Sequence, residues 1–336
     1  MYRTVIPLFL CVLLLSGGCA PKPHYVRYEG FAQGSTYHVT CSVPGRVTEQ
    51  RVRHDVDSIL LDIDATLSGY NKGSLLSQLN AGGDPCLNDF FIDCFNRSKA
   101  IWAETGGAFD PSAAPLFDLW GFGFQEKGAV TQAAIDSIRQ FVGMDLLTLE
   151  ERADGTHLAK ADPRIQLNFN AIAQGYSCDV VARHLEALGA TDYLVDIGRE
   201  IVCKGKNPAG NDWRIGLDRP SDGNFDEGKD LQAMIEVTDC GIVTSGNYRK
   251  FYVENGQKFA HTIDPSTGRP VTHSLLSATV ITADATTADA YATWLMVVGP
   301  DRAREILAQR PELEALLVYD EDGQMKTWQT EHIKTQ

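Results

Sequence analysis

The stretch that decides the fold is CGIVTSGNYRKFYVENGQKFAHTIDPSTGRPVTHSLLSATVITADATTADAYATWLMVVG, residues 240–299. Alternating apolar and polar residues lead into HTIDPSTGRP at 261–270, where two prolines and a glycine predict a sharp turn after a strand. A strand-like run follows at 276–281, and a helix is predicted from 284 to about 298, where a Gly-Pro pair ends it. The rest of the chain is interpreted outward from this order of strand, turn, strand and helix.

The predicted helix carries a candidate metal site. Asp289 and Thr293 are four residues apart, so a carboxylate and a hydroxyl lie on the same face. Such hard oxygen ligands suit Mg²⁺ and not Zn²⁺. The structural alternative is that the Asp only favours the helix dipole and the Thr only bonds its own backbone. The pair alone leaves both interpretations open.

The N-terminus has the features of a lipoprotein leader. Residues 1–18 hold Arg3 and then an apolar run, and the small residues of LSGGC at 15–19 lead to Cys19. We therefore expect Cys19 to be lipidated and residues 19–29 to be a polar tether that holds the domain on a membrane surface. The alternative is an ordinary secretory signal followed by a chance cysteine.

Composition excludes some classes of protein. The net charge of −14 argues against nucleic-acid binding, which depends on cationic patches. Without the leader the chain would have 336 − 18 = 318 residues, enough for one large core or two closely joined halves. The six cysteines beyond Cys19 show no CxxC spacing, so a zinc or thioredoxin-type site is not expected. Disulfides and buried free thiols both remain open.

The predicted elements alternate irregularly, which favours an α+β or mixed α/β fold over a regular doubly wound sheet. Neither G-x-G-x-x-G nor a P-loop is present, so an ordinary dinucleotide-binding fold has no support. A polar tail is expected at 321–336. Helices are predicted at 51–67, 90–105, 131–143 and 171–188 (with Asn170 as its cap), and strands at 30–43, 165–169, 193–197, 213–217 and 234–238.

Nine motifs occur in the order known from one protein family. They are GST at 34–36, LSGYN at 67–71, GGAFDPSAAPLFDLWGFG at 106–123, NFNAIAQGYSCD at 168–179, LVDIGREI at 194–201, WRIGLDRP at 213–220, VTSGNY at 243–248, HTIDPSTGRPV at 261–271 and ADAYAT at 288–293. On these motifs the chain resembles the ApbE family of FAD:protein FMN transferases over residues 30–320. The resemblance implies a single large domain of two closely joined halves with the flavin site between them.

The resemblance also implies an activity. The expected reaction is the Mg²⁺-dependent transfer of the FMN half of FAD to a Thr or Ser hydroxyl of an acceptor protein, with release of AMP. The implied acceptors are flavoproteins such as FMN-carrying subunits of membrane redox pumps. Family members are commonly bacterial lipoproteins, so the expected location is the cell envelope, lipid-anchored and facing the periplasm.

The resemblance assigns roles residue by residue. The implied metal ligands are the Ala171 carbonyl and the side chains of Asp289 and Thr293, while Ser245, Gly246 and Asn247 are expected in a loop near the phosphates. His261 is the candidate general base, because its ordinary pKa lies close to working pH, and Asp264 either orients His261 or caps the turn. The implied flavin-nucleotide contacts are Tyr70, Ala108, Phe109, Asp110, Asn168, Gln174 and Ile263.

Several positions depart from the family pattern. Asn168 stands where an acidic residue is usual, and Gln174 where a charged one is usual. Asn and Gln keep hydrogen-bonding capacity without charge, so flavin binding of altered strength is expected. Arg199 replaces the second Gly of an Ile-Gly-Gly motif, and it either meets a phosphate or reaches solvent. Gln33 and Ser35 replace Met and Thr around the first glycine motif.

Three other functions compete with the transferase. A Mg²⁺-dependent FAD pyrophosphatase would use the same site with water in place of the acceptor hydroxyl. A lipoprotein that only binds flavin is disfavoured, because storage needs no base beside the phosphates. A purely structural surface lipoprotein is supported only by the departures.

Overall fold

The structure is a computed structural model that describes residues 22–221, 224, 228–248, 251–254 and 257–335. The predicted leader and the expected lipidation site Cys19 lie outside these residues. The fold is a mixed α/β single domain, as predicted. No helix in the described ranges combines the length and the apolar composition that a membrane span requires.

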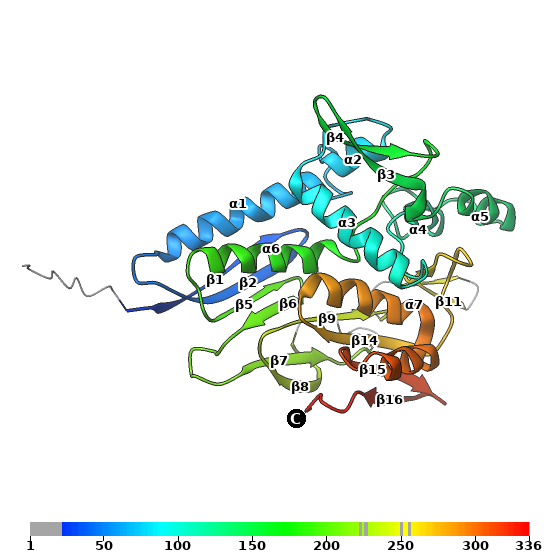
Figure 1. Ribbon diagram of the computed structural model, residues 1–336. Helices are drawn as coiled ribbons and strands as arrows, with labels where there is room; N and C mark the ends of the chain where they lie inside the picture. Colours follow the sequence, from blue (N-terminus) through cyan, green and yellow to red (C-terminus); the bar gives the residue numbers. More distant parts are fainter. Residues whose placement is uncertain (1–21, 222–223, 225–227, 249–250, 255–256, 336) are drawn as a thin grey trace, which may run out of the picture.

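The scaffold is an antiparallel sheet of eight strands in the order β1-β2-β5-β6-β9-β14-β15-β16. Helices α6 (Ala173–Ala187) and α7 (Ala285–Gln309) pack on one face of the sheet (Figure 1). Its strands are β1 (His24–Ala32), β2 (Ser35–Val43), β5 (Tyr193–Ile197), β6 (Glu200–Lys204), β9 (Cys240–Gly246), β14 (Leu275–Thr282), β15 (Glu314–Glu321) and β16 (Gln324–Gln329). We call this sheet with α6 and α7 the sheet core.

A two-stranded ribbon covers the other face of the sheet. It consists of β7 (Trp213–Asp218) and β8 (Leu231–Val237), and it buries Trp213, Ile215 and Ile235 against side chains of the central strands. The sheet is therefore covered on both faces, which is why its central strands are apolar on both sides.

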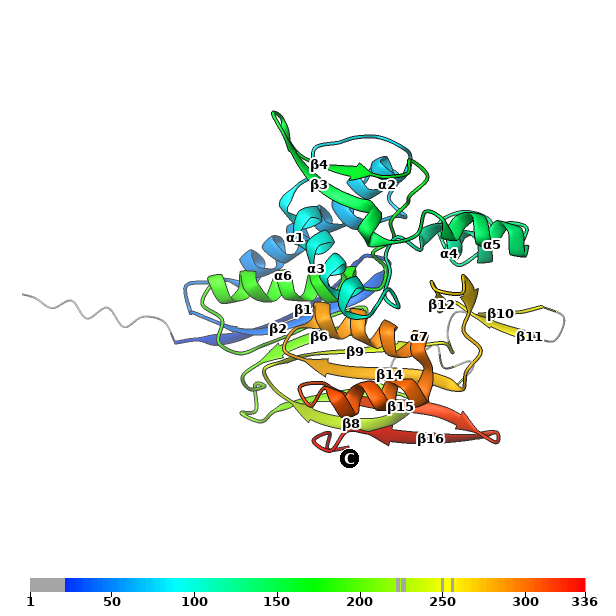
Figure 2. The ribbon, with the colours of Figure 1, turned by 45° about the vertical axis from the view of Figure 1, so that its right-hand side comes forward.

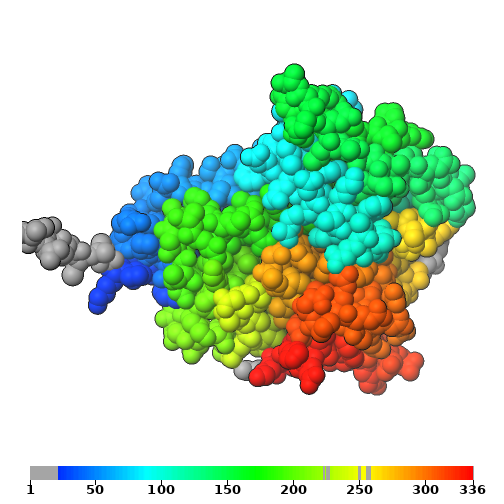
Figure 3. All heavy atoms as spheres, in the orientation of Figure 1, coloured from blue at the N-terminus to red at the C-terminus, as the bar shows by residue number. Residues whose placement is uncertain are grey.

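Residues 67–169 form a second region, which we call the cap (Figure 2). It follows α1 (Glu49–Leu67) and packs against α7 and β14 through one shared apolar cluster, so the two regions are halves of one domain. The space-filling view shows the two regions in continuous contact (Figure 3). The cap contains α2 (Leu75–Asn80), α3 (Asp89–Glu104), α4 (Ala114–Trp120), α5 (Gln132–Arg139), a 3₁₀ turn at Met144–Leu146, and the hairpin β3 (Leu147–Arg152) with β4 (Gly155–Lys160).

Two small hairpins lie beside the cap. The first is β10 (Phe251–Glu254) with β11 (Gln257–Ala260), and the second is β12 (Ile263–Asp264) with β13 (Arg269–Pro270). The second hairpin contains the predicted turn after His261. Both hairpins lie at the end of the molecule opposite the start of β1 (Figures 1 and 2).

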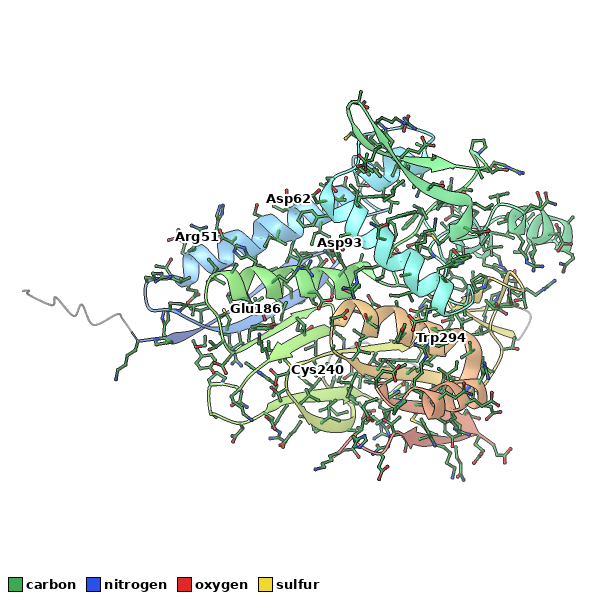
Figure 4. All side chains as sticks on the ribbon, in the orientation of Figure 1. Arg51, Asp62, Asp93, Glu186, Cys240 and Trp294 are labelled. Atoms are coloured by element: carbon green, nitrogen blue, oxygen red, sulfur yellow. The ribbon has the colours of Figure 1, made fainter. Side chains whose placement is uncertain are left out.

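Local sequence explains the helices that position the site. In α1, apolar residues at three- and four-residue steps face the core, whereas charged residues such as Arg51 and Asp62 face solvent (Figure 4). Helix α7 begins at an N-cap, Asp284, whose carboxylate accepts from the Thr287 N–H at 2.8 Å. The predicted break after residue 298 is confirmed, because Gly299 has φ 80° and ψ 173°, although the helix resumes beyond it as far as Gln309.

Both edge strands were wrongly predicted. Residues 24–29, expected in the tether, belong to β1, which runs on to Ala32. The strand predicted at 30–43 is confirmed for Ser35–Val43, which form β2 after a tight turn at Gln33-Gly34. Residues 324–329, expected in a polar tail, form β16. The physical reason is the same at both edges: only one face packs, so β1 buries little more than Val26 and Tyr28, and the sequences look polar.

The predicted strand at 165–169 was also wrong. Ile165, Leu167 and Phe169 alternate into the core as a strand would. The segment makes only an isolated bridge to Ala113, however, and the Asn80 side chain bonds the Leu167 N–H and carbonyl at 2.8 Å each. The alternation of buried and exposed side chains therefore reflects burial alone. The Asn80 side chain makes the backbone hydrogen bonds that a partner strand would make in a sheet.

The expected cap of the following helix was wrong as well. Helix α6 begins at Ala173, and the N-cap position holds Ile172, which makes no side-chain capping bond. Asn170 instead donates from Nδ2 to the Tyr70 hydroxyl at 3.3 Å. The first turn of α6 is thus left open toward the site described below.

The alternatives for the cysteines are resolved for the described residues. Cys41, Cys86, Cys94, Cys178, Cys203 and Cys240 are free thiols, and only Cys86 is exposed. Cys203 and Cys240 are cross-strand neighbours on β6 and β9 with their Sγ atoms 3.9 Å apart. Their role is that of small buried apolar residues.

Candidate active site

A cavity of about 310 Å³ lies where the sheet core meets the cap. It is bounded by the first turn of α6, the middle of α7, the β5–β6 turn, the end of β9 and the β12 hairpin. Of the twelve residues predicted as metal ligands, acid–base groups or flavin-nucleotide contacts, only Asp264 is absent from its lining. The lining contains Tyr70, Ala108, Phe109, Asp110, Asn168, Ala171, Gln174, His261, Ile263, Asp289 and Thr293.

The predicted metal ligands come together in this cavity. Asp289 is 4 % exposed and Thr293 lies one helical turn further along α7 on the same face. The Thr293 hydroxyl is 3.5 Å from the Ser245 hydroxyl at the end of β9. Ala171 reaches the same space from the loop before α6. Two segments far apart in sequence thus bring three oxygens to one place.

Close packing of α6 on α7 brings these segments together. A Cβ on Gly175 would stand 2.3 Å from the Ala285 carbonyl oxygen, so only glycine fits this contact. The Gly175 N–H donates to Asp289 Oδ2 at 3.2 Å. In a regular helix that N–H would bond the Ala171 carbonyl four residues earlier. The described hydrogen bonds include none to the Ala171 carbonyl, which is therefore available to a ligand.

Burial governs the charge of Asp289. Burial, with a smaller contribution from the nearby Asp179, raises the pKa of the carboxyl to about 7 even though the hydrogen bond from the Gly175 N–H opposes the shift. Asp179 is itself held at the start of α7 by the Ala285 and Thr286 N–H groups. A bound cation would favour the ionised form of Asp289, because opposite charge offsets the desolvation.

The residues present fit a magnesium ion. A free carbonyl, a buried carboxylate and a hydroxyl are the hard oxygen donors that Mg²⁺ prefers, with water and phosphate oxygens completing its coordination. Among the described residues, no cluster of three or more His, Cys, Asp or Glu side chains could hold a metal. The donor set here contains a single carboxylate, so it depends on further oxygens from a ligand.

The cap supplies an aromatic wall. Tyr70 is 62 % exposed, and its ring packs edge-on against Phe124 with centroids 5.0 Å apart. Gly69 permits this contact, since a Cβ there would lie 2.1 Å from the Phe124 ring. The Tyr70 hydroxyl accepts from Asn170, which joins the ring to the loop that carries Ala171. An exposed ring held at its edge is suited to stacking on a planar ligand.

Asp110 forms a polar floor next to this wall. Its carboxylate accepts from Trp102 Nε1 at 3.0 Å and from the Ser112 N–H at 2.8 Å. Burial raises its pKa to about 6, while these donors work in the opposite direction. Asp110 is thus part of a buried network between α3 and α4.

Asn168 and Gln174 occupy their predicted places in the cavity lining. Asn168 Oδ1 accepts from the Asn170 N–H at 2.8 Å, so this side chain shapes the loop before α6. Gln174 lies against the β5–β6 turn, where a Cβ on Gly198 would stand 2.2 Å from Gln174 Nε2. Neither amide adds a charge to the cavity.

His261 and Asp264 have different surroundings. His261 lines the cavity and packs edge-on against Phe122 with centroids 6.4 Å apart. Asp264 Oδ1 accepts from the Ser266 N–H at 2.8 Å, which is the bond of a turn-capping residue. Of the two roles expected for Asp264, the described contacts support only capping.

The predicted phosphate loop is the end of a strand. Ser245 and Gly246 close β9 and line the cavity. Asn247 does not line it, because its Oδ1 accepts from the Thr262 hydroxyl at 2.6 Å and thereby supports the segment next to His261.

Comparisons with known proteins agree with this geometry. A model of the ApbE family matches residues 33–317. The chain belongs to the ApbE family. It is 33 % identical over 323 residues to the FAD:protein FMN transferase of Haemophilus influenzae, covering 94 % of this chain and 92 % of that protein. The Escherichia coli K12 protein of the same name is 32 % identical, with 97 % and 95 % covered.

Solved structures of the family share the fold. The flavin transferase ApbE of Vibrio cholerae matches with a TM-score of 0.78 and 31 % identity, over 92 % of this chain and 98 % of that one. The apo form of the Pseudomonas stutzeri flavinyl transferase ApbE matches with a TM-score of 0.80 and 32 % identity, over 92 % and 95 %. The predicted family and fold class are confirmed.

Some residues of this ApbE cavity were missed from sequence. Glu200, Asp218, Phe122, Thr244 and Tyr248 also line it. Each lies within a quoted family motif or beside one, but nothing local distinguishes them from core or surface residues. Only tertiary packing, which brings the β5–β6 turn and the ends of β7 and β9 to one cavity, places them at the site.

Proposed function

We propose that this protein transfers the FMN moiety of FAD to a Thr or Ser hydroxyl of an acceptor protein and releases AMP, with Mg²⁺ as cofactor. One observation carries the proposal. A single cavity joins three oxygen donors, from Ala171, Asp289 and Thr293, to an aromatic and polar wall at Tyr70 and 108–110. That combination suits a ligand with both a pyrophosphate and planar rings. The family's named activity supplies the reaction class.

The cavity residues divide the chemistry between them. Asp289, Thr293 and the Ala171 carbonyl would hold Mg²⁺, which when bound supplies positive charge for the pyrophosphate and the leaving phosphate. Tyr70 orients a ring, and the Ser245 hydroxyl supports Thr293 at 3.5 Å. His261 accepts the proton of the acceptor hydroxyl as its oxygen forms a bond to the flavin-side phosphorus and the bond to AMP breaks.

The acceptor and the location belong to the same proposal. We expect lipidation at Cys19 and attachment in the bacterial envelope on the periplasmic side. The hairpins beside the cavity lie at the end of the molecule opposite the start of β1 (Figure 2). A tether that joins at β1 would therefore leave this end free to meet FMN-carrying subunits of membrane redox pumps.

The test uses residues 20–336 with FAD, Mg²⁺ and a peptide containing one Thr or Ser. Mass spectrometry should show addition of FMN to the peptide and equimolar AMP. His261→Ala should lower the rate by about 100-fold or more, as loss of a general base does. His54→Ala, at an exposed position of α1, is the matched control and should be unchanged.

Other outcomes identify the competing functions. Free FMN and AMP with unmodified peptide would show an FAD pyrophosphatase, and unchanged FAD bound to the protein would show a flavin carrier. A wild-type rate in His261→Ala would remove His261 from the mechanism while leaving the transferase assignment intact.

A further inference from the structure

The β5–β6 turn brings a cation to a strained position in the cavity wall. Gly198 and Arg199 have φ values of 67° and 82°, the left-handed pair that a two-residue hairpin turn requires. Glycine takes this conformation freely, whereas a residue with a Cβ is disfavoured. The Arg199 N–H donates to Asp196 Oδ1 at 2.9 Å, which helps to hold the turn. The backbone alone would therefore favour glycine at position 199.

The Arg199 side chain is anchored by a buried carboxylate. Its Nη1 lies 2.8 Å from Asp218 Oδ2, and the Asp218 side chain is only 2 % exposed. The Arg199 side chain is 23 % exposed, and both residues line the cavity. A guanidinium has five N–H donors in a planar fork, so this contact leaves others for a ligand.

The charge of the lining makes Arg199 distinctive. Among the described residues that line the cavity, Arg199 is the one arginine, and lysine is absent. The carboxylates of Asp110, Glu200, Asp218 and Asp289 line the same space. A dianionic pyrophosphate would meet repulsion here unless cations offset these charges.

A second observation at the same turn points to a ligand. Glu200 Oε2 is buried and has no hydrogen-bond partner among the described residues. Buried carboxylate oxygens are rarely left without a donor. Glu200 follows Arg199 directly in the chain and faces the same cavity. The turn thus presents an unsatisfied polar oxygen and a guanidinium with spare N–H donors to the same cavity, and of the two only the guanidinium can bind a phosphate.

We propose that Arg199 binds the phosphate groups of FAD, holding Asp218 with one edge of its guanidinium and a phosphate oxygen with another. The inference rests on the proposed function and adds a positioning residue at a place where the family pattern has glycine. Paired N–H···O bonds from a planar fork hold a phosphate in a fixed orientation, which a lysine ammonium cannot do. Arg199 thus favours flavins with phosphates over those without.

The test compares Arg199→Gly with wild-type protein. Dissociation constants for FAD and for riboflavin, which has no phosphate, are measured by flavin fluorescence with Mg²⁺ present. We expect Arg199→Gly to weaken FAD binding about 10- to 100-fold, as loss of a charged hydrogen bond does, and riboflavin binding less than about 3-fold. The FAD constant of the variant should also depend less on ionic strength. Arg214→Ala, an exposed arginine on β7, is the control and should match wild type.

Each outcome decides the inference. Equal losses for FAD and riboflavin, or none, would overturn the phosphate contact. Arg199→Lys keeps the charge without the fork and should lie between Arg199→Gly and wild type for FAD, so it carries the test if Arg199→Gly does not fold. Wild-type protein that fails to bind FAD at all would instead remove the proposed function. Wild-type protein that labels the acceptor peptide, together with an unaffected Arg199→Gly, would remove only the role of Arg199.

Discussion

The sheet core and the cap contribute to the same cavity in opposite ways. The sheet core brings Asp289, which is 4 % exposed and lies on helix α7. Helix α6 packs so closely against α7 that there is no room for a Cβ atom at Gly175. The cap brings Tyr70, which is 62 % exposed and lies on a loop. A cation needs fixed oxygens, whereas a planar ring needs only a surface to lie on. For the proposed function, the sheet core would therefore set reactivity, and the cap would contribute to affinity by holding the flavin ring.

The largest effect should come from Asp289→Asn. The amide oxygen can still accept from the Gly175 N–H, so the fold should persist, but the charge that is proposed to hold Mg²⁺ is lost. We expect FMN transfer to fall by at least about 100-fold, because several kcal/mol of charge stabilisation depend on the metal. Stabilisation by Mg²⁺, measured as the rise in melting temperature on its addition, should disappear.

The metal-free protein gives an independent check on Asp289→Asn. The folded-state pKa of Asp289 is raised from 3.8 to about 7, so the wild-type carboxyl increasingly destabilises the folded state as pH rises from about 4 to about 7. In the absence of metal, the melting temperature of Asp289→Asn minus that of wild type should therefore increase as pH rises across this range. Asp301→Asn, on the same helix with a 93 % exposed side chain, is the control. Undiminished transfer by Asp289→Asn would contradict the division between the regions.

A smaller but clear effect is expected from Gly175→Ala. In a helix with free space this change stabilises by about 1 kcal/mol, because alanine has the higher helix propensity. Here the new Cβ would lie 2.3 Å from the Ala285 carbonyl oxygen and 2.8 Å from the Asp289 Cβ. We expect a loss of about 1–3 kcal/mol in the free energy of unfolding, together with weaker Mg²⁺ binding. Thermal melting and calorimetric titration measure the two effects, and a raised melting temperature would show that α6 and α7 are not tightly packed.

The comparison also shows what the sequence could predict. Asp289 and Thr293 were found because helical spacing is local, and their shared face needs no tertiary information. The Gly175 contact with Ala285 and the positions of Glu200 and Asp218 at the cavity depend on tertiary packing, which no short sequence pattern contains. Most residues assigned by family resemblance line the cavity, since members of a family share a fold and the same motif positions therefore meet in space. Asp264 and Asn247 are exceptions, because the Asp264 carboxylate bonds the Ser266 N–H within its own turn and the Asn247 side chain accepts from the Thr262 hydroxyl.

Secondary structure shows the same limit. Segments whose backbone hydrogen bonds are all made within a helix or to strands on both sides, such as 51–67 and 276–281, were predicted closely, as α1 and β14 show. The edge strands β1 and β16 were missed because neighbours on one side and solvent on the other leave a polar sequence. The segment 165–169 was assigned to a strand because its side chains alternate into the core, although Asn80 satisfies its backbone. The hydrophobic pattern of a segment indicates which side chains are buried, whereas its pairing with a neighbouring strand has to be inferred separately.

The smallest effects should come from Tyr70. Tyr70→Ala removes the ring, and we expect FAD binding to weaken roughly 10-fold, since stacking on an aromatic side chain contributes about 1–3 kcal/mol. Transfer at saturating FAD should change little, because the oxygens of the sheet core stay in place. Stability should stay within about 0.5 kcal/mol, as is usual for an exposed side chain. Fluorescence titration and the rate at saturation separate the two quantities.

Tyr70→Phe separates the contribution of the Tyr70 ring to FAD binding from that of its hydroxyl. It keeps the ring on Phe124 and loses only the 3.3 Å contact from Asn170 Nδ2 to the hydroxyl, so FAD binding should weaken by no more than about 3-fold. Leu61→Ala, at an exposed apolar position on α1, controls for nonspecific loss of surface and should bind FAD as wild type does. If Tyr70→Phe instead lowered the rate at saturation as strongly as it lowered affinity, the Asn170 bond would be positioning the Ala171 loop. The cap would then share in reactivity, because the loop that it holds carries one of the three oxygens proposed to bind the metal.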